Sequence, residues 1–388
     1  MIDLLDLNRE ELQALLTAWG QPGYRAKQIW RWLYVNRVAS PDEMTNLPKP
    51  LRARLTAETR IGALTPIAHQ QSQDGETVKW LFEIPPPSIP PRGGEAASPP
   101  VGRSEGGPTS PPVGGTEGET EGGPPVQIET VLMNYHQRRT VCISSQAGCS
   151  MGCTFCATGH MGLQRNLSAG EIVAQVLFVA RELAREGQTL SNVVLMGMGE
   201  PLANYDAVMT ALRRLIDPDG FNMGQRRISL STVGLPQAIR RFSREGLQVN
   251  LAVSLHAASD MLRDALVPIN RRYPLDPLLA ACHDYVAQTN RRISFEWALI
   301  RGVNDSPEQA SILTKRIRGL LCHVNLIPLN PTTRYPGAPS SPESVDAFCA
   351  ELEDYGIPTT VRVRRGIDIQ AGCGQLRERE SSTLSDKL

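Results

Sequence analysis

The sequence has no long apolar run, no net charge and very little lysine. None of its apolar stretches approaches the roughly eighteen residues of a membrane-spanning helix, so we expect no membrane association. The first sixteen residues, MIDLLDLNREELQALL, are acidic and amphipathic and lack the basic and apolar segments of a signal peptide. We therefore expect a cytoplasmic protein.

The charge balance does not by itself point to a nucleic-acid partner, because 40 basic residues offset 40 acidic ones. Only five of the basic residues are lysine, and the rest are arginine. Arginine binds phosphate with a planar fork and stacks on bases. A GC-rich genome produces the same excess, so both explanations stay open.

The 388 residues are enough for one large core and a small accessory domain. Residues 1–60 carry leucines at helical spacing, and Tyr24–Tyr34 interleaves basic and aromatic residues, so we expect a small N-terminal helical domain. The second helix fits either a core stripe with a solvated basic face or a helix that contacts RNA.

Residues 78–84 and 127–133 have the composition of two strands, and we expect a β-hairpin extension over 61–84 and 127–140. Residues 85–126 between them are rich in proline and glycine, which predicts a disordered insertion at the hairpin tip. Such insertions cost little, because the entropy of loop closure grows slowly with length. We also expect a flexible tail over 377–388.

From residue 141 to 376, strand-like and helix-like segments alternate, which predicts a parallel sheet with right-handed crossovers. Six units are too few for a closed eight-stranded barrel, so the fold class is α/β, with a partial (β/α)6 barrel. Its active site should lie at the C-terminal ends of the strands. The predicted strands are 141–145, 192–197, 227–231, 248–254, 293–299 and 323–328.

Three of the eight cysteines lie within eight residues, at Cys149, Cys153 and Cys156. Structural disulfides are rare in a reducing cytosol, so clustered cysteines should be metal ligands or catalysts. Zinc would need a fourth ligand, for which His160 is close enough in the sequence. An iron–sulfur cubane held by three thiolates would instead keep one iron open for a ligand.

The spacing CxxxCxxC at the mouth of a partial barrel resembles the radical S-adenosylmethionine (SAM) superfamily. That resemblance implies a [4Fe-4S] cluster on Cys149, Cys153 and Cys156, whose open iron binds SAM. Polar residues at later strand ends support it, because Glu200 in the segment Met196–Pro201 can accept a hydrogen bond from an ammonium group.

A closer resemblance is to the RlmN family of adenine-C2 methyltransferases of 23S ribosomal RNA and transfer RNA. It covers about residues 1–84 and 127–376. The motifs that match in order and spacing are VCISSQAGCSMGCTFCATG, GMGEPLANY, ISLSTVG, VSLHA, LIPLNP and AGCGQL. The family's SAM contacts correspond here to Gly199, Glu200, Ser231, Ser254, Leu255, His256 and Asn330.

The same resemblance implies an unusual route to the methyl group. Carbon C2 of adenine is electron-poor and does not attack SAM as a nucleophile, whereas a carbon radical can add to it. One SAM would methylate Cys373, and a second would be cleaved to generate the radical. Cys142 would then attack the sulfur of Cys373 to form a transient disulfide, and Glu129 matches the family's candidate proton acceptor. The remaining lone cysteines, Cys282, Cys322 and Cys349, are expected to be buried small hydrophobes.

Two other functions remain open: a C8-specific methyltransferase of 23S ribosomal RNA, and a non-catalytic RNA-binding module with zinc or an iron–sulfur cluster. For the main hypothesis the expected partners are 23S ribosomal RNA, transfer RNA, and an electron donor such as flavodoxin with its reductase. A monomer is the default expectation.

Overall fold

The computed structural model describes residues 1–86, 124–362, 364–372 and 374–376. Almost all of the predicted insertion, the whole predicted tail and Cys373 therefore lie outside the described residues. Within the described ranges, every helix is too short or too polar to cross a lipid bilayer.

A ten-stranded sheet runs through the described part of the chain, in the order β14-β13-β12-β11-β10-β9-β6-β5-β4-β3. From β6 to β14 neighbouring strands are parallel, and from β3 to β6 they are antiparallel. The strands are β3 (Thr65–Gln71), β4 (Thr77–Ile84), β5 (Val126–Tyr135), β6 (Arg138–Cys142), β9 (Asn192–Leu195), β10 (Ile228–Thr232), β11 (Asn250–Ser254), β12 (Ile293–Leu299), β13 (Cys322–Pro328) and β14 (Thr359–Val361).

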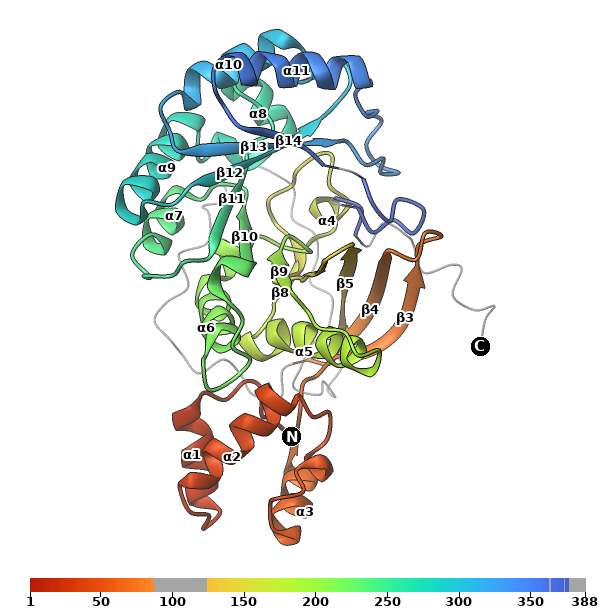
Figure 1. The fold of residues 1–388 in the computed structure, drawn as a ribbon, viewed down its shortest axis with the longest axis vertical. Helices are drawn as coiled ribbons and strands as arrows, with labels where there is room; N and C mark the ends of the chain where they lie inside the picture. Colours follow the sequence, from red (N-terminus) through yellow and green to blue (C-terminus); the bar gives the residue numbers. More distant parts are fainter. Residues whose placement is uncertain (87–123, 363, 373, 377–388) are drawn as a thin grey trace, which may run out of the picture.

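The predicted α/β class and open partial barrel are confirmed, because the sheet does not close on itself and its parallel strands alternate with helices. Figure 1 shows the longer helices arranged around the outside of the curved sheet. The helices are α4 (Ala157–His160), α5 (Ala169–Arg185), α6 (Tyr205–Ile216), α7 (Pro236–Phe242), α8 (Asp260–Leu266), α9 (Leu275–Thr289), α10 (Pro307–Ile317) and α11 (Pro342–Asp354).

The expected pairing of residues 78–84 with 127–133 is confirmed in β4 and β5, but these strands continue directly into the barrel sheet through β6. Sequence reasoning missed β3, whose side chains are mostly exposed, and the three-residue β14. It also missed a short hairpin of β7 (Gln146–Cys149) and β8 (Gly162–Asn166), which forms a separate two-stranded sheet.

The N-terminal unit is helical, as expected, and packs below the barrel in the view of Figure 1. It comprises β1 (Ile2–Asp3), α1 (Arg9–Ala18), α2 (Tyr24–Arg31), α3 (Lys49–Glu58) and β2 (Thr59–Arg60), with β1 and β2 pairing in parallel. After Arg31 the chain continues as a π-helical turn to Asn36. Trp30 and Tyr34 are buried with ring centroids 4.4 Å apart, so these aromatic residues form core, while Lys27 remains exposed.

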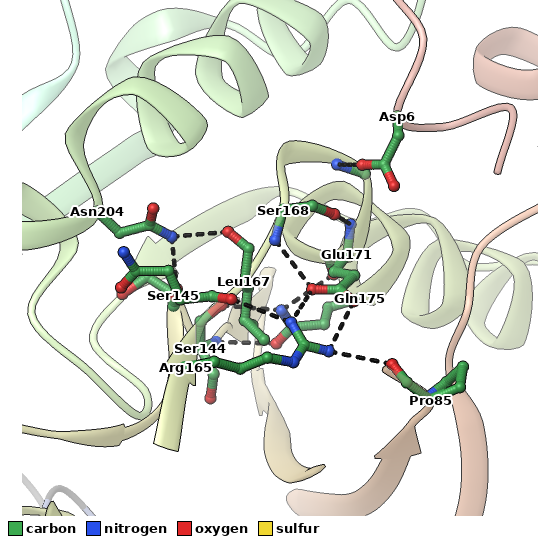
Figure 2. Close-up of polar contacts among 12 residues, drawn as sticks. Asp6, Pro85, Ser144, Ser145, Arg165, Leu167, Ser168, Glu171, Gln175 and Asn204 are labelled. Carbon is green, nitrogen blue, oxygen red and sulfur yellow. Dashed lines mark hydrogen bonds and ion pairs between the residues drawn. The ribbon is translucent and has the colours of Figure 1, made fainter. Parts of the chain in front are cut away.

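A buried polar network fixes the segment that leads from Cys142 to the cysteine cluster (Figure 2). Ser168 and Glu171 form a capping box at the start of α5. One turn further, Gln175 accepts hydrogen bonds from Thr130 Oγ1 and from the Ser144 backbone N–H, each at 2.8 Å, and donates to the Ser144 carbonyl at 2.9 Å. The helix thereby holds β5 and the end of β6 in register.

Candidate active site

A cavity of about 180 Å³ lies at the C-terminal ends of the parallel strands β9 to β13. This is the edge at which the sequence predicted an active site. Nine of the predicted residues line it: Cys149, Cys153, Cys156, Gly199, Glu200, Ser231, Ser254, His256 and Asn330.

The cysteine loop follows β7 and packs against the end of α8. The Thr154 backbone N–H donates to the Leu266 carbonyl at 3.0 Å, and the Cys156 N–H donates to the Cys153 carbonyl at 3.1 Å. Just before the loop, Gly148 of β7 has a φ of +74°, and a Cβ there would lie 1.9 Å from the Gly162 carbonyl oxygen. Only glycine fits there, so β7 and β8 can approach closely enough to aim the loop at the cavity.

The donor set of the three cysteines fits an iron–sulfur cubane. Burial, together with the charges of Cys156 and Glu200, raises the pKa of Cys149 to about 12, and burial raises the pKa of Cys153 well above its ordinary value. Three thiolates in a site poor in water require a cationic centre to hold them ionised. The irons of such a cluster would supply that charge.

The zinc alternative finds no support in the arrangement of side chains. In the described part of the chain, no three His, Cys, Asp or Glu side chains converge where one metal ion would fit. His160, the potential fourth ligand, is exposed, and its Nε2 donates to the Thr154 carbonyl at 2.7 Å. A cubane needs no such convergence, because each thiolate binds a different iron.

Glu200 is a buried carboxylate at the cavity wall. Its Oε1 accepts from the Leu202 backbone N–H at 2.9 Å and its Oε2 from the Val233 N–H at 2.6 Å. Burial nevertheless raises its pKa to about 7. A ligand ammonium in the cavity would favour the ionised form, as expected for a residue that binds the amino group of SAM.

Of the other strand-end residues, two present hydroxyl groups and two have packing roles. Ser231 and Ser254 lie side by side on β10 and β11, with their hydroxyl oxygens 3.4 Å apart. Gly199 has a φ of +99°, and a Cβ there would lie 2.5 Å from the Gln146 side chain, so glycine is required by the packing against β7. Leu255 lies in the core and donates its backbone N–H to the Glu296 carbonyl at 3.0 Å.

His256 is buried and supports the cysteine loop. Its Nδ1 accepts from the Ala298 backbone N–H at 2.9 Å, and its ring meets Phe155 edge-on with centroids 4.9 Å apart. Burial, assisted by the Arg263 charge, lowers its pKa to about 3, so the imidazole is neutral. Phe155 lies between two cluster cysteines, so this contact fixes the loop.

Sequence reasoning missed Glu296, which lines the cavity from β12. Its Oε1 accepts from Asn325 Nδ2 at 2.8 Å, and its Oε2 is buried with no hydrogen-bond partner among the described residues. Burial raises its pKa. The Arg362 charge, also at the cavity, partly offsets this. A buried carboxylate oxygen without a hydrogen bond can accept one from a ligand donor, which the ammonium group of SAM would supply. The signal in the sequence was one charged residue within the apolar strand ISFEWAL.

The segment that follows Cys373 reaches the same cavity, although Cys373 itself lies outside the described residues. Gly374 and Leu376 line the cavity. The Gly374 carbonyl accepts from the Ala157 backbone N–H at 2.7 Å, just after the last cluster cysteine. Gln375 Nε2 donates to the Pro331 carbonyl at 2.7 Å, next to Asn330.

The other two predicted catalytic residues lie on β6 and β5, the two strands next to β9 in the sheet order. Cys142 is buried on β6 between Val131 of β5 and Val194 of β9. Glu129 is buried on β5, with its Oε1 3.3 Å from Lys79 Nζ, and its backbone carbonyl accepts from Ser144 Oγ at 2.7 Å. Neither lines the cavity as it stands.

Two family models match the chain. Residues 2–61 match the ribosomal RNA large subunit methyltransferase N-terminal domain, and residues 143–312 match the radical SAM superfamily.

Similar proteins span nearly the whole chain. It is 48% identical over 375 residues to "dual-specificity RNA methyltransferase RlmN 1" of Myxococcus xanthus, which covers 97% of this chain and 94% of the relative. It is 46% identical over 393 residues to "probable dual-specificity RNA methyltransferase RlmN" of Chloroflexus aurantiacus, which covers 98% and 94%. A crystal structure of a radical SAM methyltransferase from Sphaerobacter thermophilus matches with a TM-score of 0.85 and 48% identity, covering 98% of this chain and all of the other.

Proposed function

The chain belongs to the RlmN family of radical SAM RNA methyltransferases, and from this premise we propose how its residues methylate RNA. The reaction places a methyl group on C2 of adenine in ribosomal and transfer RNA. The proposed targets are one adenine of 23S ribosomal RNA and the adenine on the 3′ side of the transfer RNA anticodon.

One observation carries the assignment of residues. The three cluster cysteines, the carboxylates of Glu200 and Glu296, and the residues that follow Cys373 all line one cavity. A reactive group formed from SAM there would lie beside the loop that holds the proposed methyl carrier, and bringing reactants into such proximity lowers the barrier.

In this proposal Cys149, Cys153 and Cys156 hold the [4Fe-4S] cluster. Glu200 accepts the SAM ammonium, and Ser231, Ser254, His256, Leu255, Gly199 and Asn330 complete the SAM site. Two SAM molecules are used per turnover. When bound, SAM supplies the methyl group, and the cluster exchanges the single electrons that create a carbon radical and later restore the aromatic base.

Cys373 and Cys142 have different tasks. Cys373 carries the methyl carbon and stays covalently joined to the RNA base after the new carbon–carbon bond forms. The Cys142 thiolate then attacks the Cys373 sulfur, so that an S–S bond forms as the S–C bond breaks. The electron pair of the broken bond takes up a proton to complete the methyl group, and an external thiol reduces the disulfide for the next turnover.

Glu129 removes the proton from C2 in this scheme. Its buried carboxylate lies on β5. Ser144, two residues after Cys142, donates a hydrogen bond from its hydroxyl to the Glu129 backbone carbonyl. A positioned carboxylate with little access to water is suited to take a proton from carbon.

We further propose a monomer that acts in the cytoplasm, where its RNA substrates are found, with a flavodoxin-type electron donor. Residues 1–60 act as an accessory domain, 61–84 and 127–140 as an extension of the sheet, and 141–376 as the catalytic barrel. The family match over residues 2–61 supports the first of these boundaries.

The decisive experiment uses anaerobically purified protein with a reconstituted cluster, reductant, SAM and unmodified 23S ribosomal RNA. Nucleosides from the digested RNA are compared with 2-methyl- and 8-methyladenosine standards by mass spectrometry. We expect 2-methyladenosine together with 5′-deoxyadenosine. Formation of 8-methyladenosine would move the activity to the C8-specific alternative, and the absence of both nucleosides and of 5′-deoxyadenosine would overturn the radical mechanism.

A further inference from the structure

We propose that Lys79 is a positioning residue that couples the proton acceptor Glu129 to the loop that carries Cys373. This inference rests on the proposed function, and it assigns to a buried lysine of β4 a task in one step of the reaction. Three observations support it: its burial, its two contacts, and the tethers at either end of the loop.

The first observation is the burial of a charged pair. The Lys79 side chain is 9% exposed and that of Glu129 is 8% exposed, and Nζ lies 3.3 Å from Oε1. The strand register explains the contact, because Glu129 lies opposite Leu81 on β4 and Lys79 is two residues away on the same face. Burying an ion pair has a large desolvation cost, and a well-packed apolar pair is often at least as stable. Fold stability alone therefore gives little reason for lysine here.

The second observation is where the remaining hydrogen-bonding capacity of Lys79 goes. Its Nζ also donates to the Gln370 carbonyl at 3.2 Å, across 291 positions of sequence. Gln370 has a φ of +53°, and its N–H donates to the Ile367 carbonyl at 3.0 Å, so this carbonyl belongs to a tight turn. Gln370 precedes Cys373 by three residues. One ammonium group thus contacts both the proposed base, Glu129, and the loop that contains Cys373, the proposed methyl carrier.

The third observation is that the loop is tethered on both sides of Cys373. Before it lie the Lys79 contact and a hydrogen bond from the Gln73 N–H to Asp368 Oδ2 at 2.9 Å. After it, the Gly374 carbonyl is held by the Ala157 N–H beside the cluster. Lys79 differs from the other tethers in that it also fixes Glu129. Its loss should displace the base relative to the methyl carrier while the SAM site stays intact.

The test compares Lys79→Met with Lys79→Arg and with Asp368→Asn. Asp368→Asn weakens a tether of the same loop that has no contact with Glu129, so it serves as the matched control. Four products are followed in single-turnover reactions: methylated Cys373, 5′-deoxyadenosine, the protein–RNA adduct and 2-methyladenosine. Separate multiple-turnover reactions at varied RNA concentration give kcat and KM.

For Lys79→Met we expect 2-methyladenosine formation to slow at least about tenfold in kcat, because general-base catalysis contributes about 10²–10⁴-fold and depends on position. Methylated Cys373 and 5′-deoxyadenosine should stay within about twofold of wild type, since both form before proton removal. The adduct should persist, as in Glu129→Gln. Lys79→Arg should recover part of the rate, and Asp368→Asn should remain near wild type.

A double variant keeps the test decisive if Lys79→Met folds poorly, because Glu129→Gln removes the buried negative charge that faces Lys79. Lys79→Met combined with Glu129→Gln should be no slower than Glu129→Gln alone, since residues acting on one step are not additive. Losses that multiply, or a parallel fall of all four products, would overturn the proposal. If wild type makes no 2-methyladenosine, the proposed function itself fails.

Discussion

At the residue scale, the two proposed catalytic cysteines, Cys142 and Cys373, should respond in opposite ways to mutation. Cys142→Ala should accumulate a covalent protein–RNA adduct, because the thiolate that releases the RNA is missing. Cys373→Ala should form no adduct, because the methyl carrier is missing. Denaturing gel electrophoresis with labelled RNA measures both. Normal turnover by Cys142→Ala would exclude the disulfide step, and Cys282→Ala, at a buried cysteine of α9, is the control.

Glu200 should make the free energy of unfolding of the cluster-free protein depend on pH. The pKa of this glutamate is 4.5 unfolded and about 7 in the fold. The folded protein therefore binds the Glu200 proton more tightly than the unfolded chain does. The stability that this proton contributes is fully present below about pH 4.5 and is lost as the pH rises through about 7. The loss amounts to roughly 3 kcal/mol.

Urea denaturation of the cluster-free protein from pH 5.5 to 8 measures this effect, with Glu200→Gln as reference. The free energy of unfolding of wild type should fall relative to that of Glu200→Gln across this range. If the two curves run parallel, Glu200 does not titrate as its burial implies.

At the element scale, α5 should stabilise the fold through Gln175 as well as through its buried apolar face. Gln175→Leu removes four buried hydrogen bonds: one to Thr130, two to the backbone groups of Ser144 and one to the Glu171 carbonyl. Each buried polar group left unpaired costs about 1–3 kcal/mol, so we expect a loss of at least about 3 kcal/mol of unfolding free energy. The same substitution at exposed Gln164 is the control, and an equal effect of both would refute the proposed role of the network.

A comparison of predicted and observed strands shows which of them the local sequence pattern can predict. Each strand segment predicted from residue 78 onward overlaps a strand of the structure, because apolar alternation and turn residues reflect local backbone preferences. The segment 141–145 overlaps β6 only at residues 141 and 142. Strand β3 was not predicted because its exposed edge position leaves no apolar alternation in its sequence. Strand β7 was not predicted because its four residues, QAGC, include no β-branched or aromatic side chain.

At the scale of the whole molecule, the predicted insertion should be dispensable. Strands β4 and β5 remain paired up to Ile84 and Val126, so a few residues suffice to join them. Removing Ser88–Gly123 should change the melting temperature little and leave methylation of 23S ribosomal RNA within about twofold, since loop closure depends weakly on length. A large fall in rate at an unchanged melting temperature would mean that these residues contact RNA or a partner.

The sequence by itself determined the parts that depend on neighbouring residues: the strand–helix alternation, the CxxxCxxC loop, and the placement of polar residues at strand ends. Only the tertiary structure decided which distant residues meet. Glu296 lines the cavity, and Lys79 donates a hydrogen bond to the Gln370 carbonyl. Glycine is required at position 199 because a Cβ there would clash with Gln146. The physical reason is that spacing along the chain fixes local backbone geometry, whereas contacts across hundreds of residues follow from strand register and packing.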